Sequence, residues 1–249
     1  MGNIIKAELY KLRKDRSFWL LTLLLVVASI IYPLLIVFDE GTELFKLSDF
    51  YQSKLLSANN YVIKLVPCIL AGFFISKEYS FGTMKSIVSS GNSRIRIYFA
   101  KLVVFSIGAI IISLIVPVVL TGTFALYFDF QNMPELDYFL KTIGLIVLYA
   151  AAYASMMALL ATLLTDSGKA IALMLLFFQV SESIMFQFAD LIPVFEFVPN
   201  YFIFNLVWEI INASTFNNSE MFKMIIVPVV TFAVFGLWGS FVLQKKEIK

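Results

Sequence analysis

The chain has 249 residues, of which 60% are hydrophobic and only 14% are charged, and its formal net charge is +2. Soluble globular domains are about 45–50% apolar and about 25% charged, so this composition excludes a soluble domain and predicts a multi-pass membrane protein. The single cysteine, Cys68, excludes an intrachain disulfide. The absence of histidine argues against a metal site and against a histidine general base.

Residues 1–16 precede the first apolar run and predict an amphipathic helix. Ile5, Leu9 and Leu12 share one face at helical spacing, and basic side chains occupy the rest of the surface. Such a helix lies in the plane of the membrane interface. The alternative is a merely basic segment that orients the first span.

Six apolar runs are each long enough for a membrane span, which needs about 20 residues. They are too long to be strands of a membrane barrel, which are about 10 residues each. The predicted fold class is therefore an all-α membrane protein with six transmembrane helices in a single domain over residues 1–249. The predicted spans are Ser17–Phe38, Leu55–Ser76, Leu102–Phe128, Thr142–Thr165, Ala170–Ala189 and Met224–Gln244.

The distribution of Lys and Arg predicts the orientation. With the N-terminus inside, 14 of the 19 basic residues fall in cytoplasmic segments. The positive-inside rule then predicts a multi-pass protein of the cell membrane with both termini in the cytoplasm. The external segment 190–223 is too apolar for a simple loop and is interrupted by Pro193 and Pro199, which predicts one or two short re-entrant helices between spans five and six.

Motifs for catalysis or nucleotide binding are missing from the sequence. The pair Gly168-Lys169 is followed by Ala170, where a P-loop has Ser or Thr, and Leu163 stands where its first glycine belongs. We therefore expect no enzyme activity and no bound cofactor or metal in this chain. If ATP drives its function, ATP and Mg²⁺ bind to a separate ATPase, and no nucleic acid is expected as a partner.

The cytoplasmic segment 77–101 combines basic residues with a short helical stretch and turn residues. These features predict either a docking surface or a solvated loop. The run Lys77-Glu78-Tyr79-Ser80-Phe81-Gly82-Thr83-Met84-Lys85, followed by Arg94 and by Tyr98-x-x-Lys101, resembles the segment after the second span of ABC-2-type transporter permeases. Gly91-Asn92 departs from the pattern, since relatives often have a proline there.

The resemblance implies a coupling helix that contacts two ATPase subunits, and a second permease subunit, identical or homologous. The residues matched to this contact are Glu78, Tyr79, Gly82, Thr83, Met84, Lys85 and Arg94. The small size and the lack of a soluble domain are most similar to permeases of Gram-positive bacteria that handle peptides. These include exporters of phenol-soluble modulins and permeases for self-protection against lantibiotics or bacitracin.

Two charged residues, Lys64 and Glu182, interrupt otherwise apolar spans at similar depth in the outer half of the membrane. Gln179, Ser183 and Gln187 recur beside Glu182 at intervals of four residues, which predicts a polar stripe along the translocation path. The alternatives are that Lys64 snorkels to the outer headgroups, that Glu182 is protonated, or that the two residues form a structural pair.

Small residues at Ala150, Ala154 and Ala158 predict close helix packing, either within one subunit or in a dimer.

The predicted function is export of an amphipathic peptide. The peptide is expected to be amphipathic because the spans are apolar, and cationic because the outer segments are acidic. A lipid, a hydrophobic drug or an ion is the alternative substrate. A non-transporting membrane sensor or scaffold is the rival function, and an intramembrane enzyme is a third.

Overall fold

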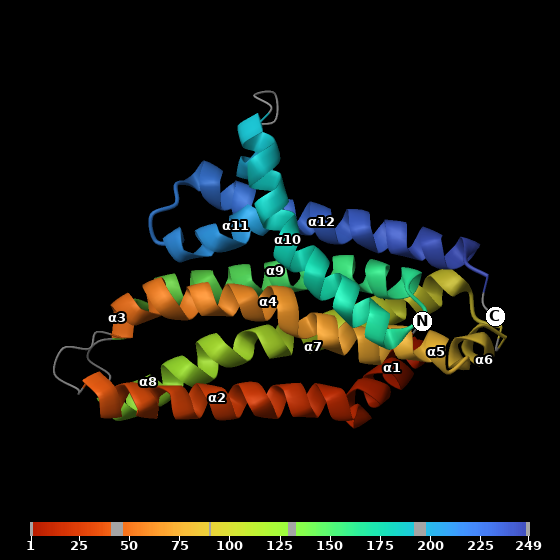
Figure 1. Cartoon of the computed structure of the whole chain (residues 1–249), viewed down its shortest axis with the longest axis horizontal. Helices are drawn as coiled ribbons and strands as arrows, with labels where there is room; N and C mark the ends of the chain where they lie inside the picture. The colour runs from red at the N-terminus through yellow and green to blue at the C-terminus, as the bar shows by residue number, and fades with distance from the viewer. Residues whose placement is uncertain (1, 41–46, 90, 129–132, 192–197, 248–249) are drawn as a thin grey trace.

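The computed structural model describes residues 2–40, 47–89, 91–128, 133–191 and 198–247, and within them the regular structure is helical (Figure 1). The longer helices run lengthwise in one bundle. The α-helices are α1 (Gly2–Lys14), α2 (Arg16–Glu40), α3 (Leu47–Phe50), α4 (Leu56–Ala71), α5 (Lys77–Ser80), α6 (Thr83–Ser89), α7 (Arg94–Ile115), α8 (Thr121–Phe128), α9 (Leu136–Leu163), α10 (Ser167–Leu191), α11 (Ile203–Glu209) and α12 (Asn218–Lys245).

Five of the six predicted spans are confirmed as helices that are long and apolar enough to cross a membrane. Short π-helical turns join α3, α4 and α5 into one continuous helix, and a third such turn joins α7 to α8. The five segments are Arg16–Leu35, Leu47–Ser80, Arg94–Tyr127, Leu136–Leu163 and Asn218–Lys245. Most extend beyond the predicted bounds, because the helices continue into polar sequence after the apolar run ends.

Predicted span five is not confirmed as a single crossing. Helix α10 covers the whole of the predicted span Ala170–Ala189, and its apolar part within the described side chains is Ser167–Ser181. The first half of α10 lies along the bundle and the second half turns away from it (Figure 1). A second short apolar stretch, Ile203–Asn212, consists of α11 and a short 3-10 turn. Five spans are therefore confirmed, and α10 remains the candidate for the predicted fifth of the six.

The short helices between α10 and α12 lie within the segment where the sequence predicts them. Ile203, Phe204, Leu206 and Val207 are buried on α11, which contacts α4, α10 and α12. This apolar face explains why α11 packs along the bundle. Residues 192–197, which include Pro193, lie outside the described residues.

Helix α9 forms the centre of the bundle and contacts α4, α7, α10 and α12. Ala150, Ala154 and Ala158 are fully buried inside the single chain. Their small side chains permit the close approach of neighbouring helices. The structure therefore assigns these three residues to packing within one subunit.

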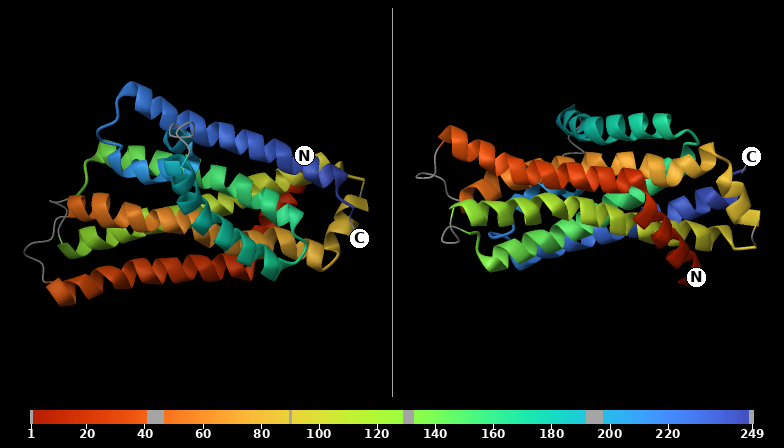
Figure 2. Two further views of the ribbon diagram at one scale, coloured as in Figure 1. Left: turned by 45° about the horizontal axis from the view of Figure 1, so that its top comes forward. Right: turned by 90° about the horizontal axis from the view of Figure 1, so that it is seen from below.

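Both ends of the chain lie at the same end of the bundle as α5 and α6 (Figures 1 and 2). Helix α1 leaves the axis of α2 at a steep angle, as the right-hand view in Figure 2 shows. The break is stabilised locally, because the Phe18 amide donates to the Asp15 carboxylate at 3.0 Å and the Trp19 indole donates to the Arg13 carbonyl at 2.7 Å. An Asp at this position is a favourable helix N-cap, so α2 begins here.

We predict that Gly239→Ala destabilises the contact between α12 and α7. An added methyl group at Gly239 would overlap the Tyr98 hydroxyl and ring, and Tyr98 is buried with little room to move. Overpacking of this kind costs about 1–3 kcal/mol, measured as a lower midpoint of thermal unfolding in detergent. Gly144→Ala is the control, because a methyl group at Gly144 on α9 meets no atom within 4 Å. Equal unfolding midpoints for the two variants would contradict this packing.

Candidate functional site

The segment from α5 to α6 forms a tight corner at the end of the second spanning helix. Gly82 adopts φ +69°, a left-handed conformation that side chains disfavour, and it ends α5. The Thr83 hydroxyl donates to the Glu78 carbonyl at 3.2 Å, and the Lys85 amide donates to the Gly82 carbonyl at 3.2 Å. The corner therefore has a defined shape that depends on glycine at position 82.

A second glycine explains the departure from the family pattern. Gly91 has φ +85°, which proline cannot adopt, because its ring fixes φ near −65°. The turn before α7 is thus built for glycine in this chain. Ser93 then caps α7 by accepting a hydrogen bond from the Arg96 amide at 3.4 Å.

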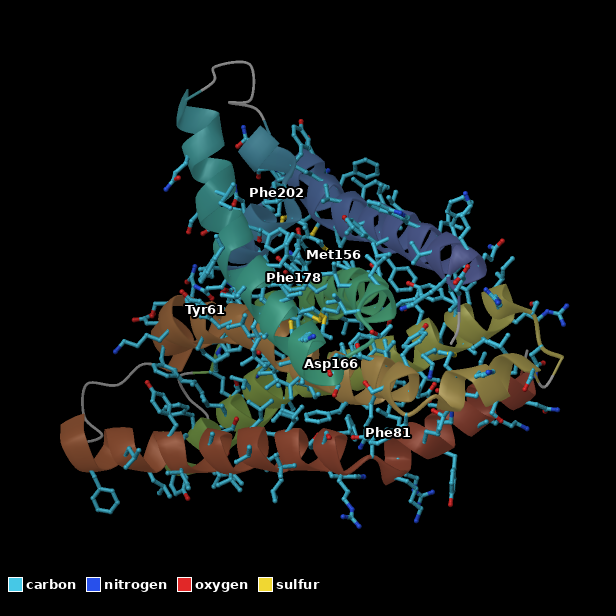
Figure 3. All side chains as sticks on the ribbon, turned by 45° about the vertical axis from the view of Figure 1, so that its right-hand side comes forward. Tyr61, Phe81, Met156, Asp166, Phe178 and Phe202 are labelled. Carbon is cyan, nitrogen blue, oxygen red and sulfur yellow. The ribbon has the colours of Figure 1, made fainter. Side chains whose placement is uncertain are left out.

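The residues matched to the ATPase contact divide into an exposed group and an inward-facing group. Gly82, Thr83 and Lys85 are exposed, as is Phe81 at 70% (Figure 3). Met84 is completely buried and anchors α6 to the bundle. The predicted ATPase contact at Met84 stays a prediction, and it would require α6 to move, because the side chain is buried in this conformation.

Glu78 belongs to a ring of four alternating charges that connects three helices. Lys11 Nζ lies 2.7 Å from Glu8 Oε1 and 3.0 Å from Glu78 Oε1. Lys101 Nζ lies 2.9 Å from Glu8 Oε2 and 2.8 Å from Glu78 Oε2. We call these four residues the ion ring. It joins α1 to α5 and α7, so the role of Glu78 in this conformation is internal rather than at the exposed surface.

Because the ion ring is largely buried, the charge of each member has a strong effect on the other members. The side chains of Glu8 and Lys101 are 3% and 4% exposed. Burial by itself would raise the pKa of Glu8, but Lys101 and Lys11 outweigh that effect and hold its pKa below the ordinary 4.5. Burial likewise opposes the charge of Lys11, yet Glu8 and Glu78 raise its pKa above 10.5.

These directions define a pH window for the ion ring. The stabilisation from Glu8 is present above pH 4.5 and is lost as the pH falls through its lower native pKa. The stabilisation from Lys11 is present below pH 10.5 and is lost as the pH rises through its higher native pKa. Glu8 and Lys11 therefore both contribute across the neutral range.

Two further cations fasten the C-terminal end of the chain to the same region. Arg94 Nη1 donates to the carbonyls of Leu243, Gln244 and Lys246, which end α12. Lys246 Nζ donates to the carbonyls of Thr162 and Leu163 at the end of α9, and it stacks 4.2 Å from the centre of the Tyr79 ring. A cation at a helix C-terminus is stabilised by the helix dipole. Arg94 and Tyr79 thus hold the corner in place in this conformation, and their predicted contact with an ATPase stays a prediction.

The predicted path residues lie on α4 and α10, outside this corner. Lys64 is 3% exposed, and its ammonium lies 4.6 Å from the Trp208 ring on α11 and 5.3 Å from the Tyr61 ring. Gln179, Ser183 and Gln187 are exposed on α10. The side chain of Glu182 lies outside the described residues. Lys64 is buried because α11 packs over it. The hydropathy pattern of the sequence does not reveal this contact.

An aromatic cluster that the sequence analysis does not predict joins α9, α10 and α11. Tyr153, Phe178 and Phe204 are buried, with ring centres 5.4–5.6 Å apart. Phe202 stacks on Phe204 at 5.0 Å, and Figure 3 shows Phe178 and Phe202 where α10 meets α11. The sequence feature that could have indicated this cluster is the high phenylalanine content, but phenylalanines occur in all the spans. Its location therefore could not be read from composition.

Together, the long apolar helices and the fastened corner at one end define a multi-pass helical membrane protein. Comparison with protein families identifies which kind: the sequence profile described as "ABC-2 family transporter protein" matches residues 4–181, well over half of the chain. The chain therefore belongs to the ABC-2 transporter family, and its role is in membrane transport. Comparison with curated proteins finds no significant match.

We predict that Lys101→Met destabilises the protein by about 3–5 kcal/mol, because it leaves the buried Glu8 and Glu78 carboxylates with Lys11 as their remaining cation in the ring. Adding Glu8→Gln should restore part of the loss, so the double variant should lose less than the sum of the single variants. Thermal unfolding in detergent measures all three. Lys141→Met is the control, because Lys141 forms an exposed pair with Asp137 that is worth at most about 0.5 kcal/mol. Equal losses in Lys101→Met and Lys141→Met would contradict the role of the ion ring.

Proposed function

We propose that this chain is the permease subunit of an ATP-driven exporter and has no enzymatic activity of its own. Two copies, or this chain and a homologous permease, would form the pathway, and two separate ATPase subunits would bind ATP and Mg²⁺. The exposed corner at Phe81–Lys85 is the observation that carries this proposal. It is held by the ion ring, and its residues other than the buried Met84 are accessible.

The surroundings of the corner suit transmission of movement. The Ser76 hydroxyl donates to the Ala161 carbonyl at 2.9 Å and the Ser80 hydroxyl to the Thr165 carbonyl at 2.7 Å, so α5 is tied to the end of α9. The ion ring ties it to α1 and α7. An ATPase that pushed on the corner would therefore move several helices together. Both termini, at the same end of the bundle, would be cytoplasmic.

The opposite end of the bundle favours a cationic substrate. A cavity of about 220 Å³ between α11 and α12 is lined by Glu209 and Glu220, together with Lys223, asparagines and apolar side chains. Acidic groups at this end attract positive charge, and the apolar helices accept a hydrophobic face. We therefore propose a cationic amphipathic peptide as the substrate, with Glu182 and the Gln179–Ser183–Gln187 stripe on its path and Lys64 beside them.

We predict that Thr83→Glu weakens binding of the ATPase. The corner carries Lys77 and Lys85, so it suits a partner with acidic groups, and a carboxylate at position 83 would repel them. Retention of the ATPase on the purified permease should fall roughly tenfold, the effect of about 1.4 kcal/mol. The helix itself should persist, because an acidic residue in the first turn of α6 suits the helix dipole.

Ser214→Glu is the matched control, because it adds the same charge at an exposed position between α11 and α12. Both variants should insert into the membrane like the unchanged protein. After purification, both should elute at the same volume as the unchanged protein in size-exclusion chromatography. Undiminished copurification of the ATPase with Thr83→Glu would refute docking at the corner. If no ATPase copurifies even with the unchanged chain, the sensor or scaffold function is favoured.

The substrate class can be tested with the reconstituted complex in vesicles. A cationic amphipathic peptide should stimulate ATP hydrolysis, and a peptide with every Lys replaced by Glu should not. Glu209→Gln should raise the peptide concentration for half-maximal stimulation by about fivefold, because one exposed charge contributes up to about 1 kcal/mol. Equal stimulation by both peptides would reject charge selection, and stimulation by a lipid or a neutral drug alone would favour those substrates.

A further inference from the structure

An apolar groove lies in the angle between α1, α2 and α7, on the membrane-facing side of the bundle. Its volume is about 460 Å³. The apolar side chains that line it are Leu9, Leu12, Phe18, Trp19, Ile107 and Ile111. Trp19 is 54% exposed and Ile111 is 42% exposed, so the groove is open along its length. We call it the elbow groove.

The depth of the elbow groove matches one leaflet of a bilayer. Counted along α7 from Lys101 in the ion ring, Ile107 lies about 9 Å and Ile111 about 15 Å further into the bundle, at 1.5 Å per residue. Half of a hydrocarbon core is also about 15 Å. A ligand that filled the groove would therefore extend from the membrane interface towards the bilayer centre, as an acyl chain does.

Positive charge surrounds the mouth of the groove. Arg13 lines it, and Lys14 and Arg16 are exposed beside it. Within the described part of the chain, none of these three residues forms an ion pair, whereas Lys11 is paired twice. The nearby carboxylate of Asp15 accepts the Phe18 amide as the cap of α2. The three cations are thus placed to meet an anion from outside the chain.

A polar group on the groove wall gives a second, independent indication of a ligand. The Thr22 hydroxyl is buried and has no hydrogen-bond partner among the residues that the structure describes. It lines the groove between the cationic mouth and the apolar end. An unsatisfied buried hydroxyl is costly, and rotation of the Thr22 side chain towards the groove would let an ester carbonyl below a phosphate accept its hydrogen bond.

We propose that the elbow groove binds one anionic phospholipid from the leaflet at the α5–α6 end of the bundle. Its phosphate contacts Arg13, an ester carbonyl accepts from Thr22, and an acyl chain packs on Trp19, Ile107 and Ile111. The inference does not depend on the transported substrate. Because Leu12 lines the groove and Glu8 belongs to the ion ring, the bound lipid holds α1 in the position where the ring forms.

Trp19 allows a direct test, because the chain has just three tryptophans. The variant Trp208→Phe/Trp238→Phe keeps Trp19 as the sole indole. It is titrated in detergent with phosphatidylglycerol or phosphatidylcholine carrying brominated acyl chains, which quench tryptophan on contact. We expect half-maximal quenching at roughly fivefold less phosphatidylglycerol than phosphatidylcholine, the contribution of about one cation near an anionic headgroup.

Substitutions then identify the contact. In the same background, Arg13→Gln should remove the roughly fivefold preference and Arg13→Lys should keep it. Arg96→Gln is the control for loss of an exposed cation elsewhere at this end and should change nothing. Equal quenching by both lipids before substitution would overturn the proposal. The proposal would also be overturned if neither lipid quenched Trp19, because another segment or a second chain would then cover the groove.

Discussion

The ion ring of Glu8, Lys11, Glu78 and Lys101 is the interaction on which the arrangement of this end of the molecule depends. Its residues come from α1, α5 and α7, which are distant in sequence. A buried ion pair adds little net stability compared with apolar packing, but removal of one partner is costly. The ring therefore acts mainly on geometry. Apolar contacts alone would allow α1 to slide or rotate, whereas alternating charges at 2.7–3.0 Å are satisfied in one register.

Much of the fold can be predicted from the sequence, because bilayer thickness converts a run of apolar residues directly into a helix of known length. Span five shows the limit of that argument. Its composition resembles that of the other spans, but α10 also packs on α11, whose buried Phe204 stacks against Phe178 of α10. Hydropathy measures transfer into an apolar phase and does not distinguish lipid from another helix. A helix that crosses the bilayer alone and a helix that packs partly on another helix therefore look alike in the sequence.

Less of the candidate site than of the fold can be predicted from the sequence, because the contacts of a side chain depend on residues that are distant in the chain. The family-like segment identifies the right stretch of chain, and the positive φ of Gly82 agrees with a turn there. The pattern does not reveal which side chains face outward. Met84 and Glu78 read as surface residues of a hydrophilic loop, yet their neighbours come from elsewhere in the chain, as the pairing of Glu78 with Lys11 shows. Long-range pairing of this kind leaves no local signal in a single sequence.

A close contact at Gly72 connects the corner to α10 as well. A methyl group at Gly72 would overlap the Ile171 side chain and would lie 3.1 Å from the Ser167 carbonyl, so the start of α10 packs directly on the helical turn that leads into α5. The corner is therefore in contact with α10 on one side and, through the ion ring, with α1 on the other. A force applied at α5 would therefore act on two helices at the same time. These are α10, which carries the exposed polar stripe, and α1, which borders the elbow groove. Movement of the corner without movement of α1 and α10 would therefore disrupt the packing of Ile171 on Gly72 or the ring of charges.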